Sequence, residues 1–224
     1  MLRRPLKNSL RWVSVGLIAA WLTGCATTTQ PRDYTAYRAA NPKTILVLPP
    51  INETPDVQAT ASVLSNATYP LAEGGYYVIP VTLMTETFRQ NGMELPDEIH
   101  EIDPVKLNEI FGADTALYIR VTSYGVQYKV IASEAVVTAT ARLVNLRTGD
   151  ELWRGQATAS SEEGKSNNQS TLAGMLVSAL VKQVINTASD ASHPVARTAT
   201  HRLLRTGGND GLLYGPRSPF YGKN

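Results

Sequence analysis

The spacing of hydrophobic residues changes along the chain from a helical to an alternating pattern. Residues 44–48 form a short, continuous apolar run that two prolines close, which predicts a strand buried on both faces. Apolar residues recur at helical spacing between residues 57 and 71, and Pro70 predicts that this helix ends or kinks near Tyr69. A second strand and two further helices are expected at residues 76–81, 83–90 and 104–111.

Alternating apolar and polar side chains mark three runs in the second half of the chain and predict an antiparallel meander. The runs are residues 117–130, 137–143 and 152–159. An amphipathic helix is expected at residues 172–184, and the periodicity is lost after Asp190. This order of elements predicts an α/β (α+β) fold, in which helices pack on a mixed sheet that contains the meander.

The N-terminal segment has the layout of a bacterial export signal. A positively charged start leads into an apolar run at residues 12–22, which is shorter than the roughly 20 apolar residues that a spanning helix needs. The run ends in Leu22-Thr23-Gly24-Cys25, which matches the lipoprotein pattern of leucine, two small residues and cysteine. The match implies cleavage between Gly24 and Cys25, a diacylglyceryl thioether on Cys25, and acylation of the new amino terminus, with palmitate as the label of this lipid anchor. The alternative is a plain secretory signal that leaves Cys25 as a lone thiol in an oxidising compartment.

Cleavage before Cys25 changes what the composition says about function. The formal net charge falls from +2 to −2, because the signal carries four positive side chains and no acidic ones. The basic balance of the whole chain therefore gives no support for nucleic-acid binding. Ala26 stands where an aspartate would signal retention in the inner membrane, so anchoring in the outer membrane is expected. The sequence does not distinguish the periplasmic face of that membrane from its surface face. The predicted organisation is a signal peptide (1–24), a lipidated flexible stalk (25–42), an α/β domain (43–190) and an irregular C-terminal tail (191–224).

The chain matches no catalytic or phosphate-binding motif, so we expect a protein that is not an enzyme and holds no cofactor or metal. His100 lies among acidic residues, where a solvated turn is favoured over a metal site. His193 and His201 are eight residues apart in a segment expected to be poor in helix, so their spacing indicates no site.

Aromatic side chains are the candidates for contact with a partner. Tyr118, Tyr124 and Tyr128 stand at even spacings, so on a regular strand they would share one face, either as a recognition surface or, the favoured interpretation, as ordinary sheet packing. Trp153 is expected in the core. The Pro- and Gly-rich tail leaves two alternatives open, a strap on its own domain or docking on a partner. The aromatic residues of the tail are Tyr214, Phe220 and Tyr221.

Short segments spread over nearly the whole chain after Cys25 carry a family resemblance. They are residues 63–65, 69–78, 80–81, 86–88, 90–92, 152–155, 214–216 and 221–222. Together they resemble the family of bacterial lipoproteins typified by a meningococcal genome-derived surface antigen. The resemblance implies a fold similar to the N-terminal domain of the translocation protein TolB and related to the curli-secretion lipoprotein CsgG. It also implies neighbouring genes for a CsgG-like lipoprotein and another small lipoprotein, and it carries over no catalytic or ligand residues.

The expected function is that of an outer-membrane-anchored lipoprotein, a non-enzymatic assembly or accessory subunit of a CsgG-like secretion or envelope complex. Its expected partners are the membrane, through lipid on Cys25, and either a CsgG-like lipoprotein or a second copy of the chain. One alternative is a periplasmic-face module that binds glycan or peptidoglycan with the tyrosine face. Another is an envelope hydrolase with an unrecognised site, which the scarcity of histidines disfavours.

Overall fold

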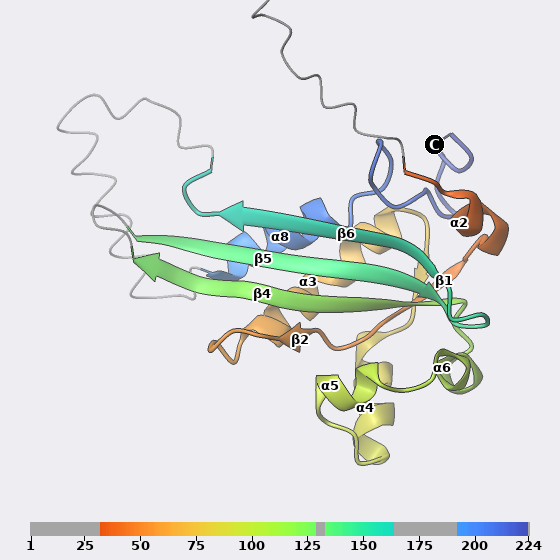
Figure 1. Ribbon diagram of the computed structural model, residues 1–224, viewed down its shortest axis with the longest axis horizontal. Coiled ribbons are helices and arrows are strands. Elements are labelled where there is room, and N and C mark those ends of the chain that lie inside the picture. The colour runs from red at the N-terminus through yellow and green to blue at the C-terminus, as the bar shows by residue number, and fades with distance from the viewer. Residues whose placement is uncertain (1–31, 129–132, 164–191, 224) are drawn as a thin grey trace, which may run out of the picture. The chain divides into compact units, whose positions relative to one another are not determined.

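A mixed sheet of six strands forms the centre of the described structure, which is a computed structural model (Figure 1). The structure describes residues 32–128, 133–163 and 192–223. Five strands follow one another across the sheet in the order β3–β1–β4–β5–β6, and β2 pairs with β4. The strands are β1 (Thr44–Val47), β2 (Ile51–Asn52), β3 (Tyr77–Val78), β4 (Thr115–Tyr128), β5 (Ser133–Asn145) and β6 (Glu151–Ser160). The described helices are α2 (Thr35–Ala40), α3 (Ala59–Glu73), α4 (Val81–Gln90), α5 (Pro96–His100), α6 (Pro104–Phe111) and α8 (Ser192–Leu203).

Parallel pairing holds one half of the sheet and antiparallel pairing the other. β1 pairs in parallel with β3 and β4, and β2 pairs in parallel with β4. β4, β5 and β6 form an antiparallel meander. The structure therefore confirms the mixed sheet with a meander and packed helices that the sequence predicts. β1 lies between two strands, and its residues Ile45, Leu46 and Val47 are at most 1% exposed, as a strand covered on both faces requires.

Two hydrophobic cores lie on opposite faces of the sheet. α3 and α8 pack on one face, against residues such as Leu117, Ile119 and Leu143. α4, α5 and α6 cover only part of the other face, where Leu46 and Tyr118 lie. Figure 1 shows β4, β5 and β6 in front of α3 and α8, with no described helix in front of β5 and β6. The outward side of these two strands is therefore open.

Local sequence signals set both ends of α6, the helix predicted at residues 104–111. The side chain of Asp103 accepts a hydrogen bond from the backbone N–H of Val105 at 2.8 Å, and Pro104 occupies the first turn. Gly112 ends the helix in the left-handed conformation, with φ of 64°.

Of the two alternatives predicted at Pro70, an end or a kink near Tyr69, the end does not occur. α3 continues through Pro70 to Glu73, and Pro70 is buried. A proline in the last turn removes a single backbone donor, and the N–H of Gly74 still donates to the carbonyl of Pro70 at 3.0 Å. Burial of the proline ring in the core offsets the lost hydrogen bond, so the helix keeps its last turn.

The folded domain begins before the boundary expected at residue 43. Helix α2 lies within the predicted flexible stalk, and Tyr34 and Tyr37 are only 7% and 2% exposed. The hydroxyl of Tyr34 donates to the carbonyl of Gly211, and that of Tyr37 contacts the hydroxyl of Tyr76. Two aromatic rings attach this short helix to the core. The segment has no apolar periodicity, so the hydrophobic pattern of the sequence did not reveal the helix.

Helix α8 corrects the expectation of an irregular tail after residue 190. Val195, Ala196, Ala199 and Leu203 are buried on one side of it. The helix packs against α3, β5 and β6. Its buried stripe consists largely of small residues between polar ones, so its periodicity is weak in the sequence. The helix expected at residues 172–184 lies outside the described residues.

Residues 204–223 form a strap on the domain, which is one of the two alternatives that the sequence left open. The N–H groups of Gly215 and Arg217 donate to the carbonyls of Gly74 and Gly75 at 2.8 and 3.1 Å. Gly75 has φ of +95°, and a Cβ atom there would lie 2.4 Å from the backbone nitrogen of Ser218. The strap therefore passes so close to residue 75 that only glycine leaves room there.

Candidate functional site

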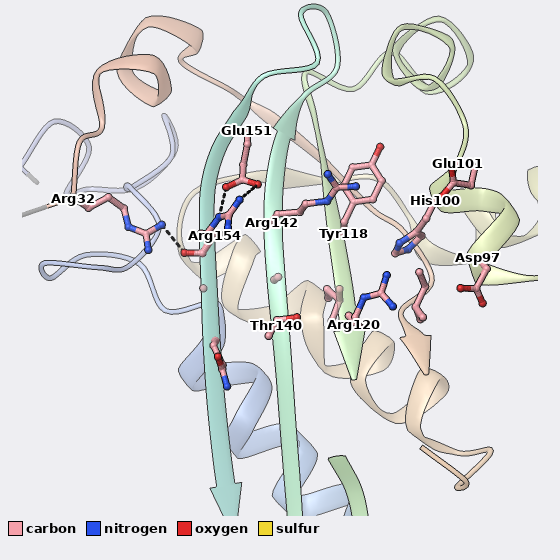
Figure 2. Close-up of a pocket in the computed structure, with 15 residues that line it drawn as sticks. Arg32, Asp97, His100, Glu101, Tyr118, Arg120, Thr140, Arg142, Glu151 and Arg154 are labelled. Atoms are coloured by element: carbon pink, nitrogen blue, oxygen red, sulfur yellow. Dashed lines mark hydrogen bonds and ion pairs between the residues drawn. The ribbon is translucent and has the colours of Figure 1, made fainter. Parts of the chain in front are cut away.

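The open side of β4–β6 forms the floor of a cleft of about 650 Å³ (Figure 2). Helix α5 and Glu101, which follows it, supply one wall, and Arg32 lies at the opposite side. The polar residues of the floor are Arg120, Thr140, Arg142, Arg154 and Gln156. Strand alternation places them here, because their neighbours Ile119, Ala141 and Trp153 point into the opposite core.

A row of three side chains crosses the floor at one level of the sheet. Tyr118 of β4 pairs with Arg142 of β5, and Arg142 pairs with Arg154 of β6. Two arginines thus stand directly opposite each other on neighbouring strands. Like charges in such a cross-strand pair destabilise a sheet, so the pair is a stability cost that packing alone does not explain.

Each arginine of the row is held by a different contact. Arg154 binds Glu151 through two nitrogens, one of them 2.8 Å from Oε2. The guanidinium of Arg142 lies 4.4 Å from the centre of the Tyr118 ring, a cation–π contact that Figure 2 shows. Arg32 donates to the backbone carbonyl of Arg154. Arg142 lines the cleft and has no carboxylate partner within the described residues, so its N–H donors lack an acceptor of opposite charge.

The wall from α5 carries His100, Asp97 and Glu101. Nε2 of His100 lies 2.9 Å from the carbonyl of Pro49, and since a carbonyl only accepts, this nitrogen carries the proton. The ring meets Tyr118 edge-on, with centroids 5.1 Å apart. Burial lowers the pKa of His100, and Arg142 lowers it further, against the opposite effects of the Pro49 hydrogen bond and Asp97. His100 is therefore neutral at neutral pH.

The charges of the cleft are separated in space. Arg142, Arg154 and Arg32 lie along β5, β6 and the segment before α2, with Glu151 beside Arg154. Asp97 and Glu101 are exposed on the α5 wall. Figure 2 shows Arg120 between Thr140 and Asp97, and Arg120 is paired with Glu53. The cleft consequently has a cationic side and an acidic side.

The three strand tyrosines do not share one face. Tyr118 belongs to the core under α4–α6 and lines the cleft, whereas Tyr124 is buried in the core on the opposite face. The register shifts between Val121 and Ser123, so Thr122 is an extra residue in β4 and reverses the alternation. Tyr128 lies at the end of β4, opposite Ser133. Gly125 does not interrupt the strand, because that residue pairs with Val136.

The aromatic residues of the strap lie away from the cleft. Tyr214 and Phe220 contact each other with ring centroids 5.4 Å apart, and Tyr221 donates to Oδ1 of Asn41 at 2.7 Å. Phe220 and Tyr221 stay about half exposed, at 53% and 48%. Trp153 is 3% exposed and donates from Nε1 to the carbonyl of Asp210, which confirms its expected place in the core.

The remaining candidate residues do not gather into a site. His193 lies on α8 beside Ser62, with Nδ1 2.7 Å from Oγ, and the ring of His201 contacts Tyr69. No group of three His, Cys, Asp or Glu side chains suited to a metal ion occurs in residues 32–128, 133–163 and 192–223. Gly24 and Cys25 lie outside these ranges. Over the same ranges, no helix is long and apolar enough to cross a bilayer.

Sequence reasoning missed the arginine row, although part of its signal was present. Arg142 and Arg154 occupy outward positions of two predicted alternating strands. The pattern places each arginine on the polar face of its strand. The register that sets one arginine opposite the other comes from the pairing of the strands, which the pattern does not contain.

Comparison with known proteins places this chain among bacterial envelope lipoproteins and names the family. Residues 32–217 match the family model "Putative lipoprotein GNA1162-like", so the chain belongs to the GNA1162-like lipoprotein family. This confirms the resemblance to the meningococcal antigen family.

Individual relatives agree with this assignment. The chain is 47% identical over 185 residues to "Putative lipoprotein NMB1124/NMB1162" of Neisseria meningitidis serogroup B (strain MC58), covering 83% of this chain and 85% of the relative. The crystal structure of lipoprotein GNA1162 from Neisseria meningitidis matches with 50% identity and a TM-score of 0.52, covering 65% of this chain and 99% of that one. A PelC dodecamer from Paraburkholderia phytofirmans matches with 19% identity and a TM-score of 0.38, covering 53% of this chain and 71% of that one, a likeness too low to argue from.

Proposed function

We propose that the protein is a non-enzymatic accessory or assembly subunit of an envelope complex, anchored in the outer membrane, and that it docks a partner protein in the cleft on β4–β6. One observation carries this proposal: the like-charged pair Arg142–Arg154 lies on a sheet face that no described helix covers. A destabilising pair on an open face is typical of a surface selected for binding. The cleft also offers an arginine with free donors, a side chain enriched in interfaces.

The anchor is the lipid that we propose on Cys25. Cys25→Ser removes the thiol that takes the diacylglyceryl group, so metabolic labelling with palmitate should disappear and the uncleaved precursor should accumulate. Ala26→Asp should move the labelled protein from outer- to inner-membrane fractions on a sucrose gradient. Normal labelling of Cys25→Ser would refute the anchor, and an unchanged distribution of Ala26→Asp would refute the proposed sorting.

The partner that the family resemblance supports is a CsgG-like lipoprotein, and a second copy of this chain is the alternative. A photo-crosslinking amino acid in place of Thr140, on the floor of the cleft, should give a crosslinked product in intact cells. The matched control is the same replacement of Thr148, an exposed residue in the turn between β5 and β6, which should give none. Mass spectrometry of the product then identifies a CsgG-like lipoprotein or the chain itself.

The absence of a product at Thr140 in a folded protein would contradict docking at the cleft. An equal yield at Thr140 and Thr148 would do the same, because it would show contact that is not confined to the site.

Peptidoglycan binding is the competing proposal. Tyr118 is the aromatic residue of the cleft on which a sugar ring would stack, yet it is 5% exposed and the guanidinium of Arg142 lies over its ring. This arrangement favours a charged partner over a glycan. Retention of the protein on purified sacculi, with loss of retention in Arg142→Gln, would reverse that preference.

A further inference from the structure

We infer that the cleft is a dipolar recognition site for a protein segment that carries both an acidic and a basic side chain. The carboxylate of the segment binds at Arg142 and Arg154, and its cation lies toward Asp97 and Glu101. The inference rests on the proposed function, because it names the chemistry of the docked partner.

The cationic side is built to take a carboxylate. The Tyr118 ring lies 4.4 Å from the guanidinium of Arg142 and holds it in place, which lowers the entropy lost when an anion binds. A guanidinium presents a planar fork that matches the two oxygens of a carboxylate. Arg154 stands directly opposite and is shared with Glu151, so it adds positive charge without offering all of its donors. A bound carboxylate would also relieve the repulsion between the two arginines.

The acidic side is not neutralised by the cationic side. Asp97 and Glu101 are exposed and have no salt-bridge partner among the described residues. Arg120 lies between the two sides but is paired with Glu53. The carboxylates of Asp97 and Glu101 therefore line the same cleft as Arg142 and remain available to a cation.

This charge layout favours a protein segment over an anionic membrane surface as the partner that binds in the cleft. A layer of phosphate headgroups brings negative charge to every part of the cleft, including the part beside Asp97 and Glu101, where it is repelled. A segment with charges of both signs meets an opposite charge on each side. On the floor beside the two arginines, Thr140 of β5 and Gln156 of β6 offer uncharged donors and acceptors for the backbone of such a segment.

The test uses the full chain, purified in neutral detergent, and rhodamine-labelled peptides in fluorescence anisotropy. One peptide alternates Gly and Ser with two Glu followed by two Lys, and a second has Gln at all four charged positions. At low salt the mixed-charge peptide should bind and the Gln peptide should not. Arg142→Gln and Asp97→Asn should each weaken binding, about tenfold for the arginine, which loses a charged hydrogen bond. Arg147→Gln, which removes the same charge outside the cleft, should change affinity less than about twofold.

Three results would overturn the inference. The Gln peptide could bind as well as the mixed-charge one, Arg142→Gln could bind like the wild type, or anionic phosphatidylglycerol vesicles could compete for the site better than the peptide does. Failure here is distinguishable from failure of the proposed function. If the crosslink at Thr140 persists in Arg142→Gln cells, docking at the cleft still holds and only the proposed charge recognition is rejected. If the wild type gives no crosslink, docking at the cleft is itself rejected.

Discussion

The phenol oxygens of Tyr37 and Tyr76 lie 2.8 Å apart inside the protein and join helix α2 to the residue that precedes β3. Tyr76 also donates to the backbone carbonyl of Leu213 at 2.6 Å. A hydroxyl has one proton, so Tyr37 is the donor in the tyrosine pair. The N-terminal helix and the C-terminal strap are thus held through one buried residue, and burial raises the pKa of both tyrosines.

Tyr76→Phe should destabilise the domain more than Tyr37→Phe. Loss of the Tyr76 hydroxyl leaves two buried groups without partners, the Leu213 carbonyl and the Tyr37 hydroxyl, at a cost of about 1–3 kcal/mol. Tyr37→Phe removes only one donor and should cost about 1 kcal/mol. Chemical denaturation measures both, with Tyr69→Phe, at a position 61% exposed, as the control. Equal costs for the two buried variants would contradict this donor order.

Gly75→Ala should cost more than Gly92→Ala, although both glycines have positive φ, +95° and +76°. Each substitution pays about 1–2 kcal/mol for the left-handed backbone. Only at Gly75 does the new Cβ also meet Ser218 and Gly215 of the strap, whereas nothing lies within 4 Å of it at Gly92. Thermal unfolding of the two variants should therefore differ, and limited proteolysis should release the strap in Gly75→Ala alone. Similar melting temperatures would show that the strap does not need this close approach.

Arg142→Gln should leave the stability of the protein unchanged or raise it by up to about 1 kcal/mol, because it removes the repulsion from Arg154. Arg147→Gln should lower stability slightly, since it breaks an exposed ion pair with Asp114 worth less than about 1 kcal/mol. Denaturant midpoints at low salt compare the two. A clear loss of stability in Arg142→Gln would mean that its contact with Tyr118 outweighs the repulsion.

The stability of the wild type should fall as the pH drops below the ordinary histidine pKa of about 6.5. Burial lowers the pKa of His100 in the folded protein, so the unfolded chain binds the proton first and acid favours unfolding. Above that pH the contribution is fully present. His100→Gln should lack this term, so its free energy of unfolding should decline less than that of the wild type between pH 7.5 and 5.5. Parallel curves for the two proteins would exclude His100 as the source.

Arg202→Ala should promote self-association. β6 is the last strand of the described sheet, and its outward carbonyls at Arg154 and Thr158 accept hydrogen bonds from Arg32 and Arg202. An edge strand with free carbonyls is a template for pairing with another chain, and these arginines occupy it. Light scattering over a concentration series should show larger particles for Arg202→Ala than for Arg205→Ala, which removes an exposed arginine after α8. The same size for both variants would show that the edge is protected in another way.

Features that depend on neighbouring residues could be predicted from the sequence. The cap at Asp103, the left-handed end at Gly112 and the alternation of the meander follow from local backbone preferences, and the structure has all three. The lipoprotein signal at Cys25 is equally local, and it remains a prediction from sequence. Short-range patterns of this kind are legible because the energies that they express act within one turn or one strand.

Contacts between residues far apart in the sequence could be seen only in the folded structure. The extra residue Thr122 sends Tyr118 and Tyr124 to opposite faces, and the register of β5 and β6 sets Arg142 opposite Arg154. Helix α8 and the strap acquire their places from small buried residues and backbone contacts rather than from an apolar stripe. These outcomes depend on packing and strand pairing between distant segments, and a hydrophobic pattern records which residues are buried but not what buries them.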